Sequence, residues 1–144
     1  MEQIRISVSD PSSDQIFIRF NLYSDLAPAT VSSFISILPF SRTYYHARLS
    51  GFEIWTEDGP KLDIPQENAS IYAEPGEIVL GPIYPERNKI AGCIGIFYGE
   101  GRLLDCGNIL GKVLEEDLLL LKSLGDSIWR EGGKIVKIEL FHGK

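Results

Sequence analysis

Hydrophobic and polar residues alternate in three stretches of the chain, two near its start and one near its end. Ile4, Ile6 and Val8 alternate with polar residues, and residues 16–22 and 136–140 repeat this pattern. A period of two is typical of a strand that buries one face. A segment rich in Pro, Ser and Asp separates the first two stretches, so we expect a β-hairpin at the start of the chain and a closing strand at its end.

The hydrophobic period changes to that of a helix in two places. Apolar residues at helical spacing predict a helix over residues 28–38, which begins with a proline and ends before Pro39. A leucine-rich run predicts a second helix over residues 118–124. The acidic residues 115–117 suit its N-terminus, and Gly125 is expected to end it.

Several shorter strands are expected between the two helices. Residues 42–55 indicate two strands that meet at Ser50 and Gly51, and residues 56–74 form the longest predicted loop. Further strands are predicted over residues 77–80, 90–98 and 108–113, with a turn at residues 99–102. Many short strands with two helices at their connections favour a mainly β protein, a barrel with helices over its ends.

Composition narrows the class of protein and its partners. The 144 residues are 44% hydrophobic and 24% charged, which indicates a single globular domain over residues 1–144. The net charge of −6 argues against nucleic acid and against anionic membranes as partners. We see no signal peptide and no apolar run of about 20 residues, as a spanning helix requires. Cys93 and Cys106 lack metal-ligand spacing, so we expect a cytoplasmic protein without metal or cofactor.

Residues 44–55 carry the candidate chemistry. The run YYHARLSGFEIW places four aromatic residues, a histidine and an arginine in a segment that otherwise resembles strand. Such side chains are costly on a half-buried sheet unless their apolar area is covered and their polar tips find partners. We therefore expect this segment to form one wall of a ligand-binding groove.

Three segments, in the same order, resemble cyclophilins. Residues 18–34 contain a strand followed by Ala-Pro-x-Thr-x-x-x-Phe, residues 44–48 read YYHAR and resemble the aromatic-His-Arg of the catalytic strand, and residues 104–113 read LDCGNILGKV. The chain is similar above all to the minimal bacterial and archaeal cyclophilin-like proteins of unknown function, through LPF at 38–40, Trp55 and IGIFYG at 94–99. This resemblance implies a closed eight-stranded β-barrel capped by two α-helices.

The resemblance also implies candidate site residues for a peptidyl-prolyl cis-trans isomerase. Arg48 would donate to the proline nitrogen and His46 would orient the substrate, while Phe97, Leu104 and Asn108 would line the pocket. Cyclophilins have His directly before Arg, whereas here one alanine intervenes. One extra residue in a strand reverses the face of the sheet unless a bulge absorbs it. Other key pocket residues of the family are also replaced, so isomerase activity remains an alternative.

We favour a second hypothesis, in which the groove binds a small molecule or peptide without turnover. Arg48 and Arg42 would hold an anionic group, and Tyr45 and Trp55 would form stacking walls. A third hypothesis is a non-catalytic interaction subunit, with the aromatic residues in a homo-oligomer interface. A fourth is a hydrolase that uses Glu53, Glu57 or Asp58 as a base.

Simple packing roles remain open for the same residues. Trp55 and Phe97 are more often core residues than pocket residues. His46 is equally compatible with a satisfied strand histidine, and Trp129 is expected to pack under the second helix.

Overall fold

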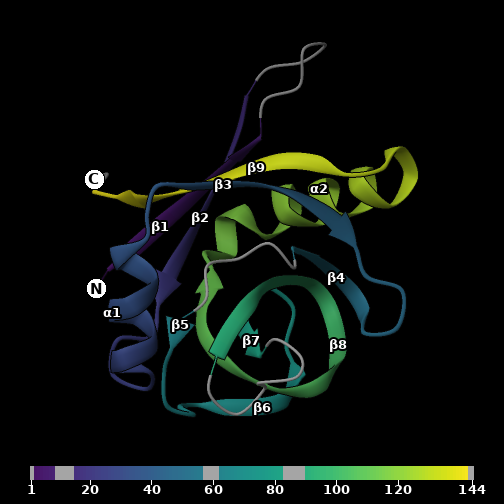
Figure 1. The fold of residues 1–144 in the computed structure, drawn as a ribbon. Coiled ribbons are helices and arrows are strands. Elements are labelled where there is room, and N and C mark those ends of the chain that lie inside the picture. The colour runs from purple at the N-terminus through teal and green to yellow at the C-terminus, as the bar shows by residue number, and fades with distance from the viewer. Residues whose placement is uncertain (1, 9–14, 57–61, 83–89, 143–144) are drawn as a thin grey trace.

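The computed structural model describes residues 2–8, 15–56, 62–82 and 90–142, with the backbone alone at residues 63, 82, 90–92, 104 and 105. The protein is mainly β, with nine strands and two α-helices among the described residues (Figure 1). The predicted loop at residues 56–74 contains two of these strands, β5 (Leu62–Asp63) and β6 (Ala69–Ala73). Its residues 57–61 lie outside the described part of the chain, as does the connection of the first hairpin, residues 9–14.

The first and last strands form one sheet, as the alternating pattern predicts. β1 (Gln3–Val8) lies between β2 (Ile16–Leu22) and β9 (Lys134–Phe141), antiparallel to both. Ile6 pairs with Ile18 on one side and with Ile138 on the other, and all three side chains are fully buried. One face of this sheet therefore carries the core, which explains why the period of two is so clear here.

Helix α1 (Pro28–Ser36) begins where the proline predicts and ends two residues earlier than expected. Ala27 at its N-cap has no side chain that can cap the helix. The carboxylate of Glu67 takes this role and accepts bonds from the backbone N–H groups of Ala29 and Thr30 at 3.2 and 2.7 Å. The segment before β6 thus closes the N-terminus of α1.

Strands β3 (Phe40–His46) and β4 (Gly51–Thr56) confirm the two strands predicted over residues 42–55. They share only two cross-strand pairs, Tyr45 with Trp55 and His46 with Ile54. The turn between them comprises residues 47–50, and Gly51 follows it with φ of +99°. Alternation along each strand places Tyr45 and Trp55 on one face and His46 and Ile54 on the other.

Strand β8 (Ile90–Val113) is a single strand of 24 residues, where the sequence predicted two strands with a turn at 99–102. Gly101 pairs with Gly51 on one side and with Ala73 on the other, so the ladder continues through the expected turn. The glycines allow the strand to bend without leaving the sheet. In Figure 1 its green ribbon curls around β7 (Glu77–Pro82), which pairs with both halves of β8.

Helix α2 (Leu118–Glu131) follows a short 3₁₀ turn, η1 (Glu115–Asp117), and corrects the prediction at Gly125. The helix continues through Gly125 because the Tyr98 ring packs against this position, and an added Cβ would lie 2.2 Å from that ring. Gly132, with φ of +100°, ends the helix instead. A glycine that permits close packing and one that terminates a helix look alike in sequence.

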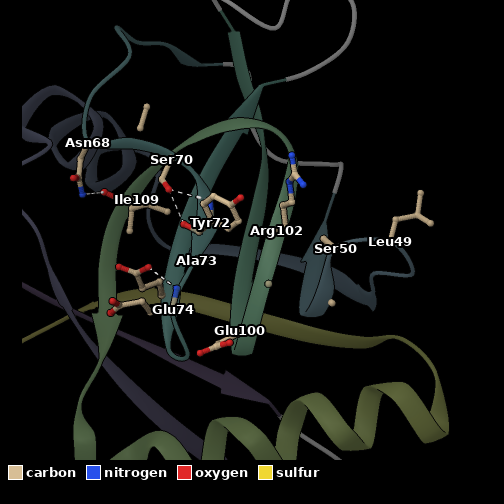
Figure 2. Close-up of a pocket in the computed structure, with 14 residues that line it drawn as sticks. Leu49, Ser50, Asn68, Ser70, Tyr72, Ala73, Glu74, Glu100, Arg102 and Ile109 are labelled. Carbon is tan, nitrogen blue, oxygen red and sulfur yellow. Dashed lines mark hydrogen bonds between the residues drawn. The ribbon is translucent and has the colours of Figure 1, made fainter.

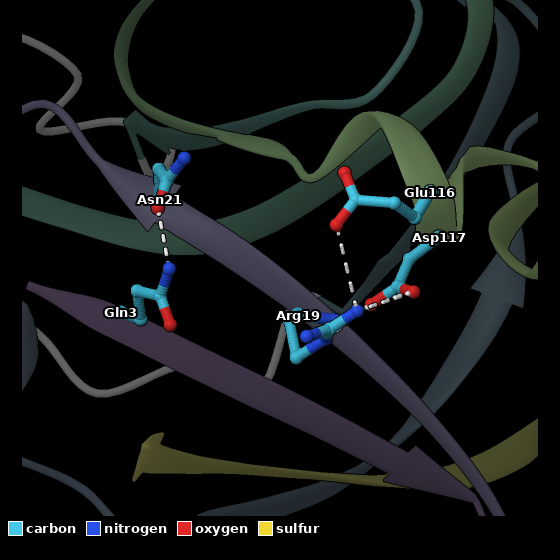
Figure 3. Close-up of polar contacts among 5 residues, drawn as sticks. All are labelled: Gln3, Arg19, Asn21, Glu116 and Asp117. Carbon is cyan, nitrogen blue, oxygen red and sulfur yellow. Dashed lines mark hydrogen bonds and ion pairs between the residues drawn. The ribbon is translucent and has the colours of Figure 1, made fainter. Parts of the chain in front are cut away.

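A partly buried ion pair attaches the start of α2 to β2. Arg19 Nε lies 2.8 Å from Asp117 Oδ2, and the Arg19 backbone N–H donates to the same oxygen at 2.9 Å (Figure 3). Glu116 lies farther away, 3.9 Å from the guanidinium. The hydrogen bond from Arg19 is the main cause that lowers the pKa of Asp117. The acids at 115–117, predicted to serve the helix N-terminus, therefore include one residue that anchors the helix to the sheet.

The strand order β2-β1-β9-β3-β4-β8 closes into a ring because β8 also pairs with β2. The main core lies inside this ring and beneath α2, and includes Ile6, Phe20, Phe34, Ile54 and Ile138. A second, smaller apolar cluster contains Ala73, Val79, Phe97 and Ile109. The predicted mainly β architecture with two α-helices is confirmed, with nine described strands in place of eight.

Candidate functional site

An open groove of about 790 Å³ lies where β4, β6 and the bend of β8 meet (Figure 2). Gly51, Gly101 and Ala73 are directly paired across these three strands, so its floor carries almost no side-chain volume. Tyr72, which is 63% exposed, stands on β6 beside this floor. The residues that line the groove are Leu49, Ser50, Gly51, Asn68, Ala69, Ser70, Tyr72, Ala73, Glu74, Glu77, Glu100, Gly101, Arg102 and Ile109.

The charged residues of the groove are mainly acidic. Glu74, Glu77 and Glu100 line it, and Arg102 is the only cationic residue among the described lining residues. Burial raises the pKa of Glu77, and the charge of Glu74 raises it further. Lys112 Nζ lies 3.1 Å from Glu74 Oε2 and partly offsets this charge. The groove thus presents a negative potential, with one guanidinium at the wall opposite Glu74.

Arg102 lies between the aromatic wall and the β3–β4 turn. Its guanidinium carbon is 5.7 Å from the centroid of the Tyr72 ring, within range of a cation–π contact. Its backbone N–H donates to the carbonyl oxygen of Ser50 at 3.0 Å. Figure 2 shows Arg102 on β8 between Tyr72 and Ser50. The groove therefore combines an aromatic ring, a guanidinium and a serine within neighbouring strands.

Ser50 and Glu53 form a hydrogen-bonded pair at this end of the groove. Ser50 is 7% exposed, and its hydroxyl donates to Glu53 Oε1. The Glu53 carboxyl occupies space over Gly95, where an added Cβ would lie 1.9 Å from Oε2. Burial raises the pKa of Glu53 to about 7, although the Ser50 hydrogen bond opposes this rise. The sequence named Glu53 only as one of three candidate bases, and the other two, Glu57 and Asp58, lie outside the described residues.

The two residues proposed for isomerase catalysis lie apart from the groove lining. Arg48 is exposed in the β3–β4 turn, and its side chain makes no hydrogen bond or ion pair with any described residue. His46 lies on the face of β3 that α2 covers. Its Nδ1 donates to the Ala47 carbonyl oxygen and its Nε2 accepts from the Tyr98 hydroxyl, each at 2.6 Å. His46 is thus a satisfied strand histidine.

The remaining predicted site residues also lie in different environments. Tyr45 is 57% exposed and Trp55 is half-buried, and they are cross-strand partners on one face of β3 and β4. Phe97 is fully buried in the smaller apolar cluster, where its ring contacts the backbone of Gly101 under the groove floor. The side chain of Leu104 lies outside the described part of the structure.

Asn108 is buried and its amide is engaged by the segment before β6. Its Oδ1 accepts the backbone N–H of Glu67 at 3.1 Å, and its Nδ2 donates to Thr30 Oγ1 and to the Pro65 carbonyl, both at 2.9 Å. These bonds hold the segment against α1. Asn108 therefore positions the strand that carries the Tyr72 wall, and its own amide atoms are already occupied.

Trp129 lies on the surface, which contradicts the expectation that it packs under the second helix. It is 62% exposed, and its ring meets the edge of the His46 ring with centroids 4.7 Å apart. Phe52, also exposed, meets Tyr98 in the same edge-to-face manner. The helix buries Leu121, Leu124 and Ile128 instead, because these residues share its inner face.

A family model for a protein of unknown function, DUF3830, matches residues 12–140. The chain belongs to the DUF3830 family. No curated protein sequence matches this DUF3830 protein.

Solved structures similar to this DUF3830 protein share its cyclophilin-like fold. McbB in complex with tryptophan is 18% identical with a TM-score of 0.68, over 98% of this chain but only 45% of McbB. A hypothetical protein of Archaeoglobus fulgidus is 21% identical, with a TM-score of 0.59, and the match covers 96% and 93% of the two chains. A cyclophilin-type peptidyl-prolyl cis-trans isomerase of Cryptosporidium parvum, with the dipeptide Ala-Pro, is 15% identical with a TM-score of 0.60, over 96% and 99%.

The described residues of this DUF3830 protein also bear on metal sites and on membrane-spanning helices. These residues contain no cluster of three or more His, Cys, Asp or Glu that would hold a metal ion. Within the same ranges, no helix has the length and apolarity needed to cross a bilayer.

Proposed function

We propose that this DUF3830 protein binds a small molecule or peptide in the groove between β4, β6 and β8, and that the ligand carries a positive charge. The observation that carries this proposal is the floor of Gly51, Gly101 and Ala73, which leaves room for a ligand beside the Tyr72 ring. A concave surface with an aromatic wall and a few polar groups is typical of ligand sites.

The proposed charge of the ligand follows from the groove lining. Three carboxylates and one guanidinium favour a cation, whereas the sequence had suggested an anion held by Arg48 and Arg42. Neither of these arginines lines the groove, and the Arg42 guanidinium instead lies 4.8 Å from the Phe40 ring centroid. Isomerase activity has less support, because Arg48 and the fully buried Phe97 do not share a pocket.

A pair of indole ligands tests both the site and the charge. McbB was solved with tryptophan, and tryptamine and indole-3-propionate keep the indole ring but differ in the charge of the tail. We expect tryptamine to bind more tightly and to shift the amide NMR signals of Ala73, Gly101 and Arg102. The peptide form of the proposal is tested in the same way with an Ala-Pro peptide that has a free amino terminus.

Tyr72→Ala and Tyr45→Ala form a matched pair for this titration. Both tyrosines are exposed on strands, but only Tyr72 lines the groove. An aromatic contact is worth about 1 kcal/mol, so Tyr72→Ala should raise the dissociation constant roughly fivefold. Tyr45→Ala should leave it unchanged. Equal effects of the two variants, or tighter binding of indole-3-propionate, would contradict the proposal.

A second candidate, an interaction subunit, is favoured by the aromatic residues beside α2. Phe52 and Trp129 are 55% and 62% exposed next to the His46–Tyr98 pair, and Leu49 in the adjoining turn is 80% exposed. Exposed aromatic residues are enriched at protein interfaces. We expect the average mass from light scattering to rise with protein concentration, and Trp129→Gln to abolish this rise while Leu119→Gln on the same helix does not.

A further inference from the structure

Ser50 is held on a tight turn with a carboxylate on one side and the groove on the other. It is buried, it lines the groove, and its hydroxyl donates to Glu53. Gly51 follows in the left-handed region of backbone conformation, where a glycine lies without strain. This serine is hydrogen-bonded to a carboxylate and lines a cavity. A hydrogen bond to a base is the first requirement for a serine nucleophile.

The position of Glu53 is hard to explain by stability alone. Its cross-strand partner is Phe97, and its carboxyl fills the space that Gly95 leaves open. Among the described residues, Ser50 is its only side-chain hydrogen-bond partner, and no lysine or arginine pairs with it. Burying a carboxyl without a cationic partner costs free energy, and such groups are common at functional sites.

Arg102 is the cationic residue among the described lining residues of the groove, and it lies next to Ser50 across the sheet. Its backbone binds the Ser50 carbonyl oxygen at 3.0 Å, and its side chain lines the groove. Ser50 thus lies in the turn before β4, Glu53 on β4 and Arg102 on the neighbouring strand β8. Acyl transfer uses a nucleophile, a base and a group that stabilises the oxyanion.

We propose that Ser50, Glu53 and Arg102 form a catalytic site for acyl transfer, and that the substrate is an ester or a peptide amide bound in the groove. Ser50 Oγ attacks the carbonyl carbon while its proton passes to Glu53. The resulting oxyanion is stabilised by the Arg102 guanidinium. Glu53 then returns the proton to the leaving alcohol or amine as the acyl bond breaks, and an acyl-serine remains. Water, deprotonated by Glu53, releases the acid and restores Ser50.

This inference rests on the proposed function in one respect: the groove is the place where the substrate binds. The pKa of about 7 for Glu53 is consistent with the role, since at neutral pH the carboxyl is able both to accept and to return a proton. The charged side chains on the elements packed against Glu53 include Arg48 in the turn, and Glu100 and Arg102 on β8. Burial raises the pKa of Glu53 and the Ser50 hydrogen bond opposes this rise, with no contribution from these charges.

Diisopropyl fluorophosphate tests the nucleophile directly, with the modified residue located by peptide mass spectrometry. We expect one adduct, on Ser50, with a rate that rises through about pH 7 as Glu53 ionises. Glu53→Gln should slow the reaction about 100-fold and remove this pH dependence, because a general base is worth roughly 10²- to 10⁴-fold. Arg102→Ala should lower kcat for p-nitrophenyl acetate without changing the pH at which the rate rises.

The chain contains a matched control. Ser127 donates to Glu131 Oε1 at 3.3 Å, but this pair is exposed on α2 and Lys134 lowers the pKa of Glu131. Ser127 should not react, and Ser127→Ala should label like the unmodified protein. The proposal would be overturned if Ser50 were labelled no faster than Ser127, or if Glu53→Gln left the labelling rate unchanged. Either result would show that the Ser50–Glu53 hydrogen bond only stabilises the turn.

The wild-type pH profile needs no variant, so the test still holds if the Glu53→Gln protein folds poorly. The two proposals also fail separately. Reaction at Ser50 without tryptamine binding would refute only the cationic ligand, and tryptamine binding without reaction at Ser50 would refute only the catalytic site.

Discussion

Replacing Glu53 by Gln should make the protein more stable at alkaline pH. The folded state raises the pKa of this carboxyl from its ordinary value of 4.5 to about 7, so it holds the proton more tightly than the unfolded chain does. The carboxyl therefore lowers the free energy of unfolding as the pH rises from about 4.5 to 7, and the full cost is present above pH 7. Glutamine has nearly the same shape as the protonated acid and does not titrate.

The size of the effect follows from the same pKa values. The rise from 4.5 to about 7 corresponds to about 3 kcal/mol, because each pKa unit is worth about 1.4 kcal/mol. Of this, about 2.5 kcal/mol develops between pH 5.0 and 8.5. Urea unfolding followed by tryptophan fluorescence at these two pH values should show the advantage of Glu53→Gln over the wild type growing by that amount.

An exposed glutamate of the same groove provides the control. Glu100→Gln should change the free energy of unfolding by less than about 0.5 kcal/mol, because Glu100 is exposed. If the advantage of Glu53→Gln differs by less than about 0.5 kcal/mol between pH 5.0 and 8.5, Glu53 is not desolvated in the folded protein. The support that its pKa gives to a base in the groove would then be lost.

Three further substitutions probe other parts of the fold. Tyr44→Phe should stabilise the protein by about 1 kcal/mol in urea unfolding, because the fully buried Tyr44 hydroxyl has no hydrogen-bond partner among the described residues; a loss of stability would reveal a partner. Asp117→Asn should lower the free energy of unfolding at pH 7, because it removes the negative charge that pairs with Arg19. That cost should shrink as the pH falls below the ordinary carboxyl pKa of 3.8, and a cost independent of pH would refute the ion pair. Gly95→Ala should lower Tm, since the added methyl group meets Glu53, and it should cost less in a Glu53→Ala background; equal costs in both would contradict the contact.

Sequence patterns predicted the outer strands better than the bend of β8. The alternation around Ile6, Ile18 and Ile138 is unambiguous because each strand buries one face. At residues 99–102 the glycines are equally compatible with a turn and with a bent strand, and only the pairing of Gly101 on both sides distinguishes these. Local sequence carries no information about such non-local pairing.

The site was harder to predict for the same reason. Of residues 44–55, the proposed wall of a binding groove, Leu49, Ser50 and Gly51 line the groove of the structure. Tyr72 and Arg102 were missed, because β6 lies in a segment without clear periodicity and Arg102 lies in the supposed turn. The order Ser-Gly-Phe-Glu at residues 50–53 could have indicated the Ser50–Glu53 pair, because a tight turn at the glycine brings the carboxylate back to the serine.

Because the long strand β8 pairs with five other strands, we expect the barrel to unfold as one cooperative unit. β2, β4, β5, β6 and β7 all pair with this one strand, so the ring opens if β8 detaches, and β2 and β4 then keep only their ladders with β1 and β3. Amide protons in the middle of β8 should therefore exchange with deuterium only when the whole domain unfolds, and the groove floor should share the slowest exchange rates of the protein. A ligand bound to that floor would slow the opening of five strands at once.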